Sequence, residues 1–238
     1  MRKAIIIGGS SGIGRELAKI LVHEEYIVGV TARRIQLLSE LQKEIGPNLL
    51  VKKMDVSKPE DAVRILHELI DEMGGCELLV ISAGTGFINP GLSWDKEEVT
   101  ISVNVSGFTA VAAAAMLHFI EKGRGHLVNI SSIAALRGQR NAPAYNASKA
   151  YASNYMQGLR QKAGHLRLPI VLTDIQPGLV DTAMARGERL FWVAAPEKAA
   201  QQIFDAIRKK KKHAYVTKRW RLIAWVLRFM PDFLYKHF

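Results

Sequence analysis

Short apolar runs alternate along the chain with longer segments whose apolar residues recur at helical spacing, and this alternation most constrains the fold. The apolar runs predict buried strands over 3–7, 27–31, 49–54, 77–82, 126–131, 169–175 and 214–217. The helical spacing predicts helices over 12–24, 35–45, 58–73, 95–122, 144–166 and 196–210.

The predicted strands are continuous apolar runs rather than alternating ones, which indicates a sheet that is covered on both faces. Strands that alternate with helices form a parallel, doubly wound sheet with right-handed crossovers. We therefore expect an α/β, Rossmann-like fold whose ligand binds at the carboxyl ends of the strands. No repeat or low-complexity linker divides the chain, so residues 1–217 are expected to form a single domain. A short, helical, basic and amphipathic segment, 218–238, follows it.

The net charge of +11 is concentrated at the C-terminus. Residues 208–238 hold ten Lys or Arg against one acid, Asp232, so the rest of the chain is near neutral. That body gives no electrostatic reason to expect a nucleic-acid partner. The single cysteine, Cys76, excludes an internal disulfide and fits a reducing, cytoplasmic location. The apolar run 4–7 is too short for a secretory signal, and no apolar stretch is long enough to predict a spanning helix.

A glycine-rich turn joins the first predicted strand to the first helix. Its sequence, Gly8-Gly9-Ser10-Ser11-Gly12-Ile13-Gly14, places small residues where a backbone approaches a pyrophosphate closely. The free N–H groups and the dipole at the start of a helix favour such an anion. The alternative is a plain strand–helix turn that binds no ligand. The position of the glycines, directly after a predicted strand and at the start of a predicted helix, favours the dinucleotide site over this alternative.

The end of the second predicted strand indicates which dinucleotide binds. NAD sites usually place an acid there to bind the ribose 2′-hydroxyl, but this chain has Thr31-Ala32-Arg33-Arg34. A guanidinium can hold a 2′-phosphate by paired, charge-assisted hydrogen bonds, so Arg33 and Arg34 favour NADP(H). The alternative is that both are solvated residues at a helix start.

Tyr145 and Lys149 lie four residues apart in a predicted helix, which puts both side chains on one face. A nearby ammonium and an oxidised nicotinamide favour the phenolate and lower the pKa of a tyrosine, which can then exchange a proton with a carbonyl oxygen. Ser131 and Ser132 end the fifth predicted strand, where a parallel sheet presents residues to its ligand.

Taken together, these motifs resemble the classical short-chain dehydrogenases/reductases in order and spacing over about residues 1–217. The residues that carry the resemblance are Gly8-x-x-x-Gly12-Ile13-Gly14, Asn104, Ser132, Tyr145-x-Ala147-Ser148-Lys149 and Pro177-Gly178-x-Val180-x-Thr182.

The resemblance implies a role for each of four catalytic residues. Tyr145 is the expected general acid/base, and Ser132, rather than Ser131, is expected to bind the substrate oxygen. Lys149 is expected to hold the nicotinamide ribose and to lower the pKa of Tyr145. Asn104 is expected to kink the long helix and to hold a water that relays protons to Lys149, or alternatively to serve only as a bend residue.

The cofactor site implied by the resemblance runs along the strand ends. Asp55 and Val56 resemble the pair that contacts adenine, although Asp55 equally suits a loop aspartate that caps the next helix. Thr182 resembles the residue that contacts the nicotinamide end. The complete expected set is Gly8, Ser10, Ser11, Gly12, Ile13, Gly14, Arg33, Arg34, Asp55, Val56, Ala83, Gly84, Tyr145, Lys149, Pro177, Gly178, Val180 and Thr182.

Two positions depart from the family's pattern. Ile7 stands where the family usually has Thr, and Ser82 stands in the stretch Ile81-Ser82-Ala83-Gly84 where it usually has Asn-Asn-Ala-Gly. A serine replaces only part of the hydrogen bonding of an asparagine, which puts local rigidity in question. The histidines are scattered without ligand spacing, so no metal site is expected.

The leading interpretation is an NADP(H)-dependent oxidoreductase that moves a hydride to or from a carbonyl or hydroxyl carbon of a small substrate. A sugar-nucleotide epimerase or dehydratase is one alternative, but about sixty residues after Pro177 leave little room for its larger substrate domain. A non-catalytic dinucleotide sensor is the other, and it predicts the loss of Tyr145, Lys149 or Ser132. Residues 183–193, which include Met184, Leu190, Phe191 and Trp192, lie where the family closes a loop over substrate and favour a partly apolar one.

Two further expectations concern partners. A dimer or tetramer is expected through the helices over 95–122 and 144–166, with outer faces that include Val111, Ala112, Ala115, Tyr151 and Tyr155. The C-terminal segment, which Pro231 should break into two short helices, combines aromatic, aliphatic and basic residues. Such a composition suits a helix in an anionic membrane interface. The favoured alternative is that this segment packs on the body, covers the substrate cleft or joins subunits.

Overall fold

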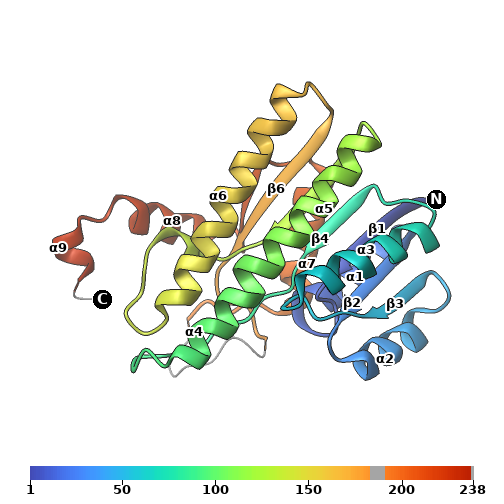
Figure 1. The fold of residues 1–238 in the computed structure, drawn as a ribbon. Helices are drawn as coiled ribbons and strands as arrows, with labels where there is room; N and C mark the ends of the chain where they lie inside the picture. The colour runs from blue at the N-terminus through green and yellow to red at the C-terminus, as the bar shows by residue number, and fades with distance from the viewer. Residues whose placement is uncertain (183–190, 237–238) are drawn as a thin grey trace.

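The protein is represented by a computed structural model that describes residues 1–182 and 191–236. Within these residues, seven parallel strands form one sheet in the order β3-β2-β1-β4-β5-β6-β7 (Figure 1). Every predicted strand is present, with ends within two residues of those expected. The strands are β1 (Arg2–Ile7), β2 (Tyr26–Ala32), β3 (Leu49–Lys53), β4 (Leu78–Ile81), β5 (Gly125–Ile130), β6 (Ile170–Pro177) and β7 (His213–Val216). The order reverses direction beside β1, which creates the crevice where such sheets bind ligands.

Helices cover both faces of the sheet, which confirms the predicted doubly wound fold and explains the continuous apolar strands. One layer holds α1 (Gly12–His23), α2 (Ile35–Ile45) and α7 (Pro196–Arg208). The other layer holds α3 (Pro59–Glu72), α4 (Trp94–Ile101), α5 (Phe108–Glu121) and α6 (Pro143–His165). A short 3-10 helix, Ile133–Leu136, follows β5.

The helices α4 and α5 form one long rod that is interrupted by a π-helical stretch, Ser102–Gly107. This stretch contains Asn104, at the position where the family resemblance implies a kink. By length and composition alone the rod would be able to cross a membrane, contrary to the sequence expectation. More than half of its apolar 18-residue stretch is buried, however, and the buried apolar residues of α5 belong to the core cluster that packs on β4 and β5, as in the core helix of a globular domain.

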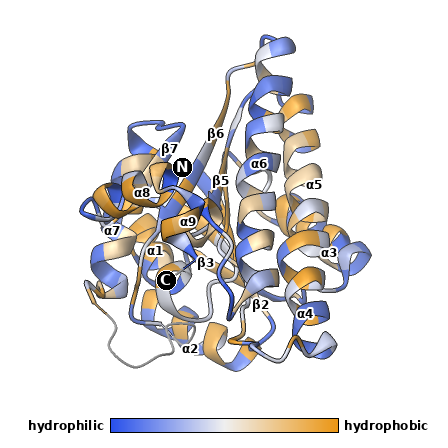
Figure 2. Cartoon of the chain, turned by 90° about the vertical axis from the view of Figure 1, so that its left-hand side faces the viewer, coloured by the Kyte–Doolittle hydropathy of each residue, from blue (hydrophilic) through white to orange (hydrophobic). Residues whose placement is uncertain are grey.

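The C-terminal segment follows β7 as two short helices, α8 (Trp220–Phe229) and α9 (Asp232–Tyr235). Pro231 separates them, as predicted, because proline cannot donate the hydrogen bond that would continue α8. Both helices lie on the side of the molecule that faces the viewer in Figure 2, and Figure 1 shows that they extend outward from this side.

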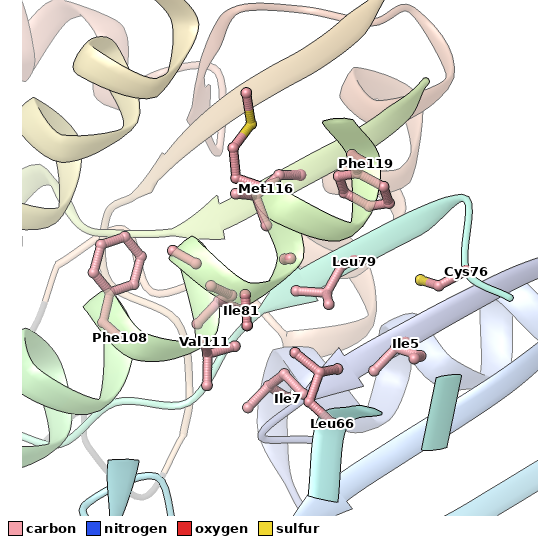
Figure 3. Packing of buried hydrophobic residues seen from close by; sticks show 14 of the residues in the cluster. Ile5, Ile7, Leu66, Cys76, Leu79, Ile81, Phe108, Val111, Met116 and Phe119 are labelled. Carbon is pink, nitrogen blue, oxygen red and sulfur yellow. The ribbon is translucent and has the colours of Figure 1, made fainter. Parts of the chain in front are cut away.

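The core on the α5 side packs apolar side chains of α3 and α5 against β1 and β4 (Figure 3). Cys76 lies in this cluster, and burial raises the pKa of its thiol to about 12, so it is not a nucleophile. The same cluster contains Val111, Ala112 and Ala115, which are fully buried. Their predicted place on an outer face is therefore wrong, because α5 turns this stripe toward the sheet. Of the predicted outer residues, Tyr151 is exposed and Tyr155 is partly buried.

Candidate active site

A cleft of about 1120 Å³ opens at the carboxyl ends of the strands. The glycine-rich turn, the end of β2, the loop after β4 and the loop after β5 all contribute to its walls. It therefore contains nearly all of the predicted cofactor and catalytic residues, although they come from distant parts of the sequence. The exceptions are Gly14 and Asn104, which lie behind the lining.

The glycine-rich turn is tightly packed and leaves the start of α1 open to the cleft. Gly8 has a φ of +93°, and a Cβ atom there would lie 2.4 Å from the backbone nitrogen of Ala83, so only glycine fits. The N-cap residue, Ser11, makes no side-chain capping bond within the described part of the chain. The first N–H groups of α1 are therefore available for an anion such as a pyrophosphate, and the turn fits a dinucleotide.

The two arginines after β2 differ in their surroundings. Arg34 donates hydrogen bonds to the hydroxyls of Ser10 (2.9 Å) and Ser11 (2.7 Å), which ties the end of β2 to the glycine-rich turn. Arg34 is exposed at the start of α2, as the alternative expected, but these two hydrogen bonds hold its guanidinium beside the turn. Arg33 is exposed and lines the cleft beside it. Together they bring positive charge to the place where a ribose 2′-phosphate would lie.

Asp55 lines the cleft beyond the end of β3. Its Oδ1 accepts hydrogen bonds from the backbone N–H of Ser57 (3.0 Å) and from the Ser57 hydroxyl (2.8 Å). The N-cap of α3 is Lys58, so Asp55 closes a local turn rather than capping that helix. Its other carboxylate oxygen remains oriented by this turn, which suits a role in binding adenine.

Tyr145, near the start of α6, points into the cleft beside Ser132. Its ring packs on Gly86, where a Cβ atom would come within 2.4 Å of the ring. Burial raises the pKa of Tyr145, and the neighbouring Ser132 hydroxyl opposes this shift. The net direction in the protein alone is upward, because the loss of hydration outweighs the neighbouring groups, whereas the sequence expectation refers to the site with an oxidised nicotinamide beside the tyrosine.

Lys149 lies one turn further along α6 and is almost fully buried. Its ammonium lies 5.8 Å from the centre of the Tyr145 ring and donates a hydrogen bond to the carbonyl of Ile130 (3.3 Å). Burial lowers the pKa of Lys149 to about 8, and the charge of Asp174 opposes this shift. Gly84 allows close approach, since a Cβ atom there would lie 3.2 Å from the ammonium.

The two adjacent serines after β5 have different partners. Ser131 is buried and bonds the carbonyl of Lys149 (3.1 Å) and the hydroxyl of Ser153 (3.0 Å). Both serines line the cleft, but the Ser131 hydroxyl is held by α6, whereas the Ser132 hydroxyl accepts a hydrogen bond from the backbone N–H of Ala134 (3.1 Å). This difference supports the choice of Ser132 as the residue that meets the substrate.

Asn104 lies beneath the cleft floor and fastens the loop that follows β4. Its side-chain oxygen accepts from the N–H of Thr85 (2.9 Å), and its amide donates to the carbonyl of Thr85 (2.7 Å) and to the Ser148 hydroxyl (2.9 Å). The backbone N–H groups of Ser82 and Ala83 both donate to the carbonyl of Ile7 (2.8 and 2.7 Å). Backbone hydrogen bonds thus connect Ile7 and Ser82, the two residues that depart from the family pattern.

The loop after β6 closes the nicotinamide end of the cleft with Pro177, Gly178, Val180 and Thr182. A Cβ atom on Gly178 would lie 2.1 Å from the indole of Trp220, which shows that α8 packs directly on this loop. Trp220 also contacts the rings of Phe191 and Trp192. The predicted substrate-loop residues 183–190, including Met184 and Leu190, lie outside the described residues.

Sequence reasoning missed several residues that line the substrate end of the cleft. Thr85 to Ile88 line it after β4, and Arg137, Leu227 and Tyr235 line it from the side of α8 and α9. Arg137 donates hydrogen bonds to the carbonyls of Leu227 (2.9 Å) and Met230 and to the carboxylate of Asp232. One side of the tail therefore packs on the body and forms part of the cleft wall.

Comparison with known proteins identifies the class of this site. Residues 2–191 match the family of short chain dehydrogenases. An uncharacterized oxidoreductase of Myxococcus xanthus is 34% identical over 188 residues, which cover 77% of this chain and 74% of the relative. Serine dehydrogenase from Escherichia coli has a similar structure, with a TM-score of 0.74 and 25% identity over 86% of this chain and 90% of that one. The closed form of serine dehydrogenase complexed with NADP⁺ gives a TM-score of 0.81 and 24% identity over 90% and 94%.

The parallel sheet, the glycine-rich turn and the cleft define a nicotinamide-dependent oxidoreductase. The chain belongs to the short-chain dehydrogenase/reductase family.

Proposed function

We propose that the protein is an NADP(H)-dependent carbonyl reductase or alcohol dehydrogenase that acts on a small, partly apolar substrate. The observation that carries this proposal is the meeting of Tyr145, Ser132 and Lys149 in one cleft, where all three side chains contribute to the lining. The same cleft reaches the arginines after β2 at its other end.

A nicotinamide bound in this cleft supplies a hydride in reduction and accepts one in oxidation. Because burial raises the pKa of Tyr145, its phenol is protonated at neutral pH and can give that proton to a carbonyl oxygen. Ser132 is placed to donate a hydrogen bond to the same oxygen and to stabilise its developing charge. Lys149 holds the ribose hydroxyls, and its positive charge offsets the charge that Tyr145 acquires after it donates.

The alternatives are less well supported. A protein that only senses a dinucleotide does not need Tyr145, Ser132 and Lys149 side by side, yet all three are present and line the same cleft. For an epimerase or dehydratase of sugar nucleotides we find no specific supporting contact among the described residues, and Phe87, Ile88 and Leu227 give the substrate end of this cleft an apolar part beside the polar Thr85 and Arg137. Such a mixed lining favours ketones and alcohols that carry a hydrocarbon substituent. A screen of such compounds, followed by cofactor absorbance, tests this substrate class.

The preference for NADP(H) rests on Arg33, Arg34 and the lack of an acid at the end of β2. Fluorescence titration should show that NADPH binds at least about tenfold more tightly than NADH, since charge-assisted hydrogen bonds to the 2′-phosphate are strong. Arg33→Ala should weaken NADPH by about tenfold and change NADH little, whereas Arg64→Ala, on the exposed face of α3, should change neither. Equal affinities, or tighter binding of NADH, would contradict the assignment.

A further inference from the structure

The outer face of α8 and α9 is an exposed apolar surface that the proposed reaction does not use. Leu222, Trp225, Val226 and Phe229 follow helical spacing on α8 and are 45% to 68% exposed, and Phe233 and Leu234 of α9 are 64% and 47% exposed. Trp225 and Phe229 contact each other with ring centres 5.3 Å apart. We call these six residues the outer face. Large apolar side chains gathered at this density mark an interaction site.

The same segment is firmly attached through its opposite side. Trp220 and Ala224 are buried, and the Arg137 guanidinium bonds the end of α8 and the start of α9. The hydroxyl of Tyr235 donates to the carbonyl of Gly138 (2.6 Å). The outer face is therefore presented by a helix pair that is fixed to the body, and it is not the uncovered side of a loose tail.

Positive charges border the outer face. Arg221 and Arg228 are exposed and lie four residues before and three residues after Trp225, which puts all three side chains on the same side of α8. Lys218, Arg219 and Lys236 flank the two helices. The one acid of this segment, Asp232, is paired with Arg137. The charges that the segment offers to a partner are thus positive, and the lysines of 209–212 lie just upstream.

We propose that the outer face docks on an anionic lipid bilayer, with its aromatic and aliphatic side chains in the interface and its arginines beside the lipid phosphates. Aromatic, aliphatic and basic residues on one helical face match the two components of such a surface. A second copy fits poorly, because a symmetric contact would place Arg221 and Arg228 against their own counterparts. Since Leu227 and Tyr235 of the same helices line the cleft, docking brings the cleft mouth to the lipid surface.

The test is co-sedimentation of the full-length protein with vesicles of phosphatidylcholine alone or mixed with phosphatidylglycerol. The protein should pellet with the anionic vesicles at low salt and be released at high salt. Trp225→Ser/Phe229→Ser should lose most of this binding, and Arg221→Ser/Arg228→Ser should weaken it by about fivefold for each charge. These side chains are exposed, so the variants should unfold at the temperature of the unchanged protein.

Two matched controls remove an exposed apolar residue and two exposed charges elsewhere. Leu166→Ser, at the end of α6, and Lys122→Ser/Arg124→Ser, before β5, should bind as the unchanged protein does. The proposal is overturned if the unchanged protein stays in solution with anionic vesicles, or if the outer-face variants bind equally well. It is also overturned if those variants convert a vesicle-independent oligomer into a monomer, since a second copy would then cover the face. None of these outcomes depends on the reaction that the cleft catalyses.

Discussion

Burial disfavours the charged forms of both Tyr145 and Lys149 and so shifts both side chains toward their neutral forms. Burial raises the pKa of Tyr145 and lowers that of Lys149 to about 8. The phenol is thus ready to donate, and the ammonium is only marginally stable at neutral pH. Asp174 on β6 opposes the loss of the lysine charge. In the proposed reaction, the protonated phenol can therefore act as the proton donor to a carbonyl oxygen.

Tyr145→Phe removes the proton donor and keeps the ring that packs on Gly86. Turnover of a confirmed ketone should fall by about 10²–10⁴-fold, because general acid catalysis is lost. The affinity for NADPH should change little, since the phenol is not its main contact. Steady-state kinetics and fluorescence titration measure the two effects separately. Tyr151→Phe, on the outer side of α6, is the matched control, and a Tyr145→Phe enzyme with near-normal turnover would show that the role is misassigned.

Lys149→Met should stabilise the fold while abolishing activity. The folded pKa of Lys149, about 8, lies below its ordinary value of 10.5, so the unfolded chain binds more protons between these values. Burial of the charged ammonium therefore lowers the free energy of unfolding by its full amount below about pH 8, and this loss disappears as the pH rises toward 10.5. At pH 7 the substitution should raise the free energy of unfolding by up to about 3 kcal/mol, since each pKa unit corresponds to about 1.36 kcal/mol.

Urea denaturation at pH 7 and above pH 10 measures this gain and its disappearance. The exposed Lys162→Met, on the same helix, should show no comparable change at either pH. A Lys149→Met protein that is less stable than the unchanged one at pH 7 would mean that the ammonium stabilises the folded state.

The sequence was sufficient to bring the main residues of the candidate site together, because each follows a predicted strand or lies at a fixed helical spacing. Ser132 follows β5, and Tyr145 and Lys149 share one face of α6. It did not predict Arg137 as a wall of the cleft. The partners of Arg137 lie 90 to 95 residues further along the chain, and no local pattern records such a contact. The upward pKa shift of Tyr145 also depends on burial by several loops, which spacing alone does not reveal.

The helices and strands themselves were predictable for the same reason, since hydrophobic period is a local property. Which side of α5 is buried, however, was not predictable from the sequence. Its sequence is apolar on most sides, so Val111, Ala112 and Ala115 looked as suited to an interface as to the core. Only the packing of α5 against the sheet, with α3 on one side and α6 on the other, decides that they are buried.

The attachment of α8 and α9 depends on Arg137, which joins two backbone carbonyls and one carboxylate. Arg137→Ala should leave these acceptors without their donor and destabilise the helix pair locally by about 1–3 kcal/mol. Hydrogen exchange should become faster in α8 and α9 and remain unchanged in β1 and β4. The exposed neighbour Arg140→Ala should leave exchange unaffected. Uniform acceleration throughout the protein would instead indicate that α8 and α9 unfold together with the core.

Assembly of the whole molecule is expected through the exposed sides of α5 and α6. On α5, Leu117 is 65% exposed, and on α6, Tyr151 is 38% exposed, stacks with Tyr155 and hydrogen-bonds Thr109 (2.8 Å). This surface carries exposed apolar and aromatic groups, which a second copy can cover in a symmetric contact. We therefore predict a dimer or a tetramer that contains this contact.

Light scattering at micromolar protein should give a mass that is a multiple of 26.4 kDa. Leu117→Arg/Tyr151→Arg should shift the protein toward the monomer, because a symmetric interface would have to bury each added charge on both copies. Leu222→Arg, on the outer face of α8, should leave the mass unchanged, which separates this contact from the proposed lipid surface. A 26.4 kDa species for the unchanged protein would contradict the prediction, and a monomer produced by Leu222→Arg alone would place the subunit contact on α8 instead.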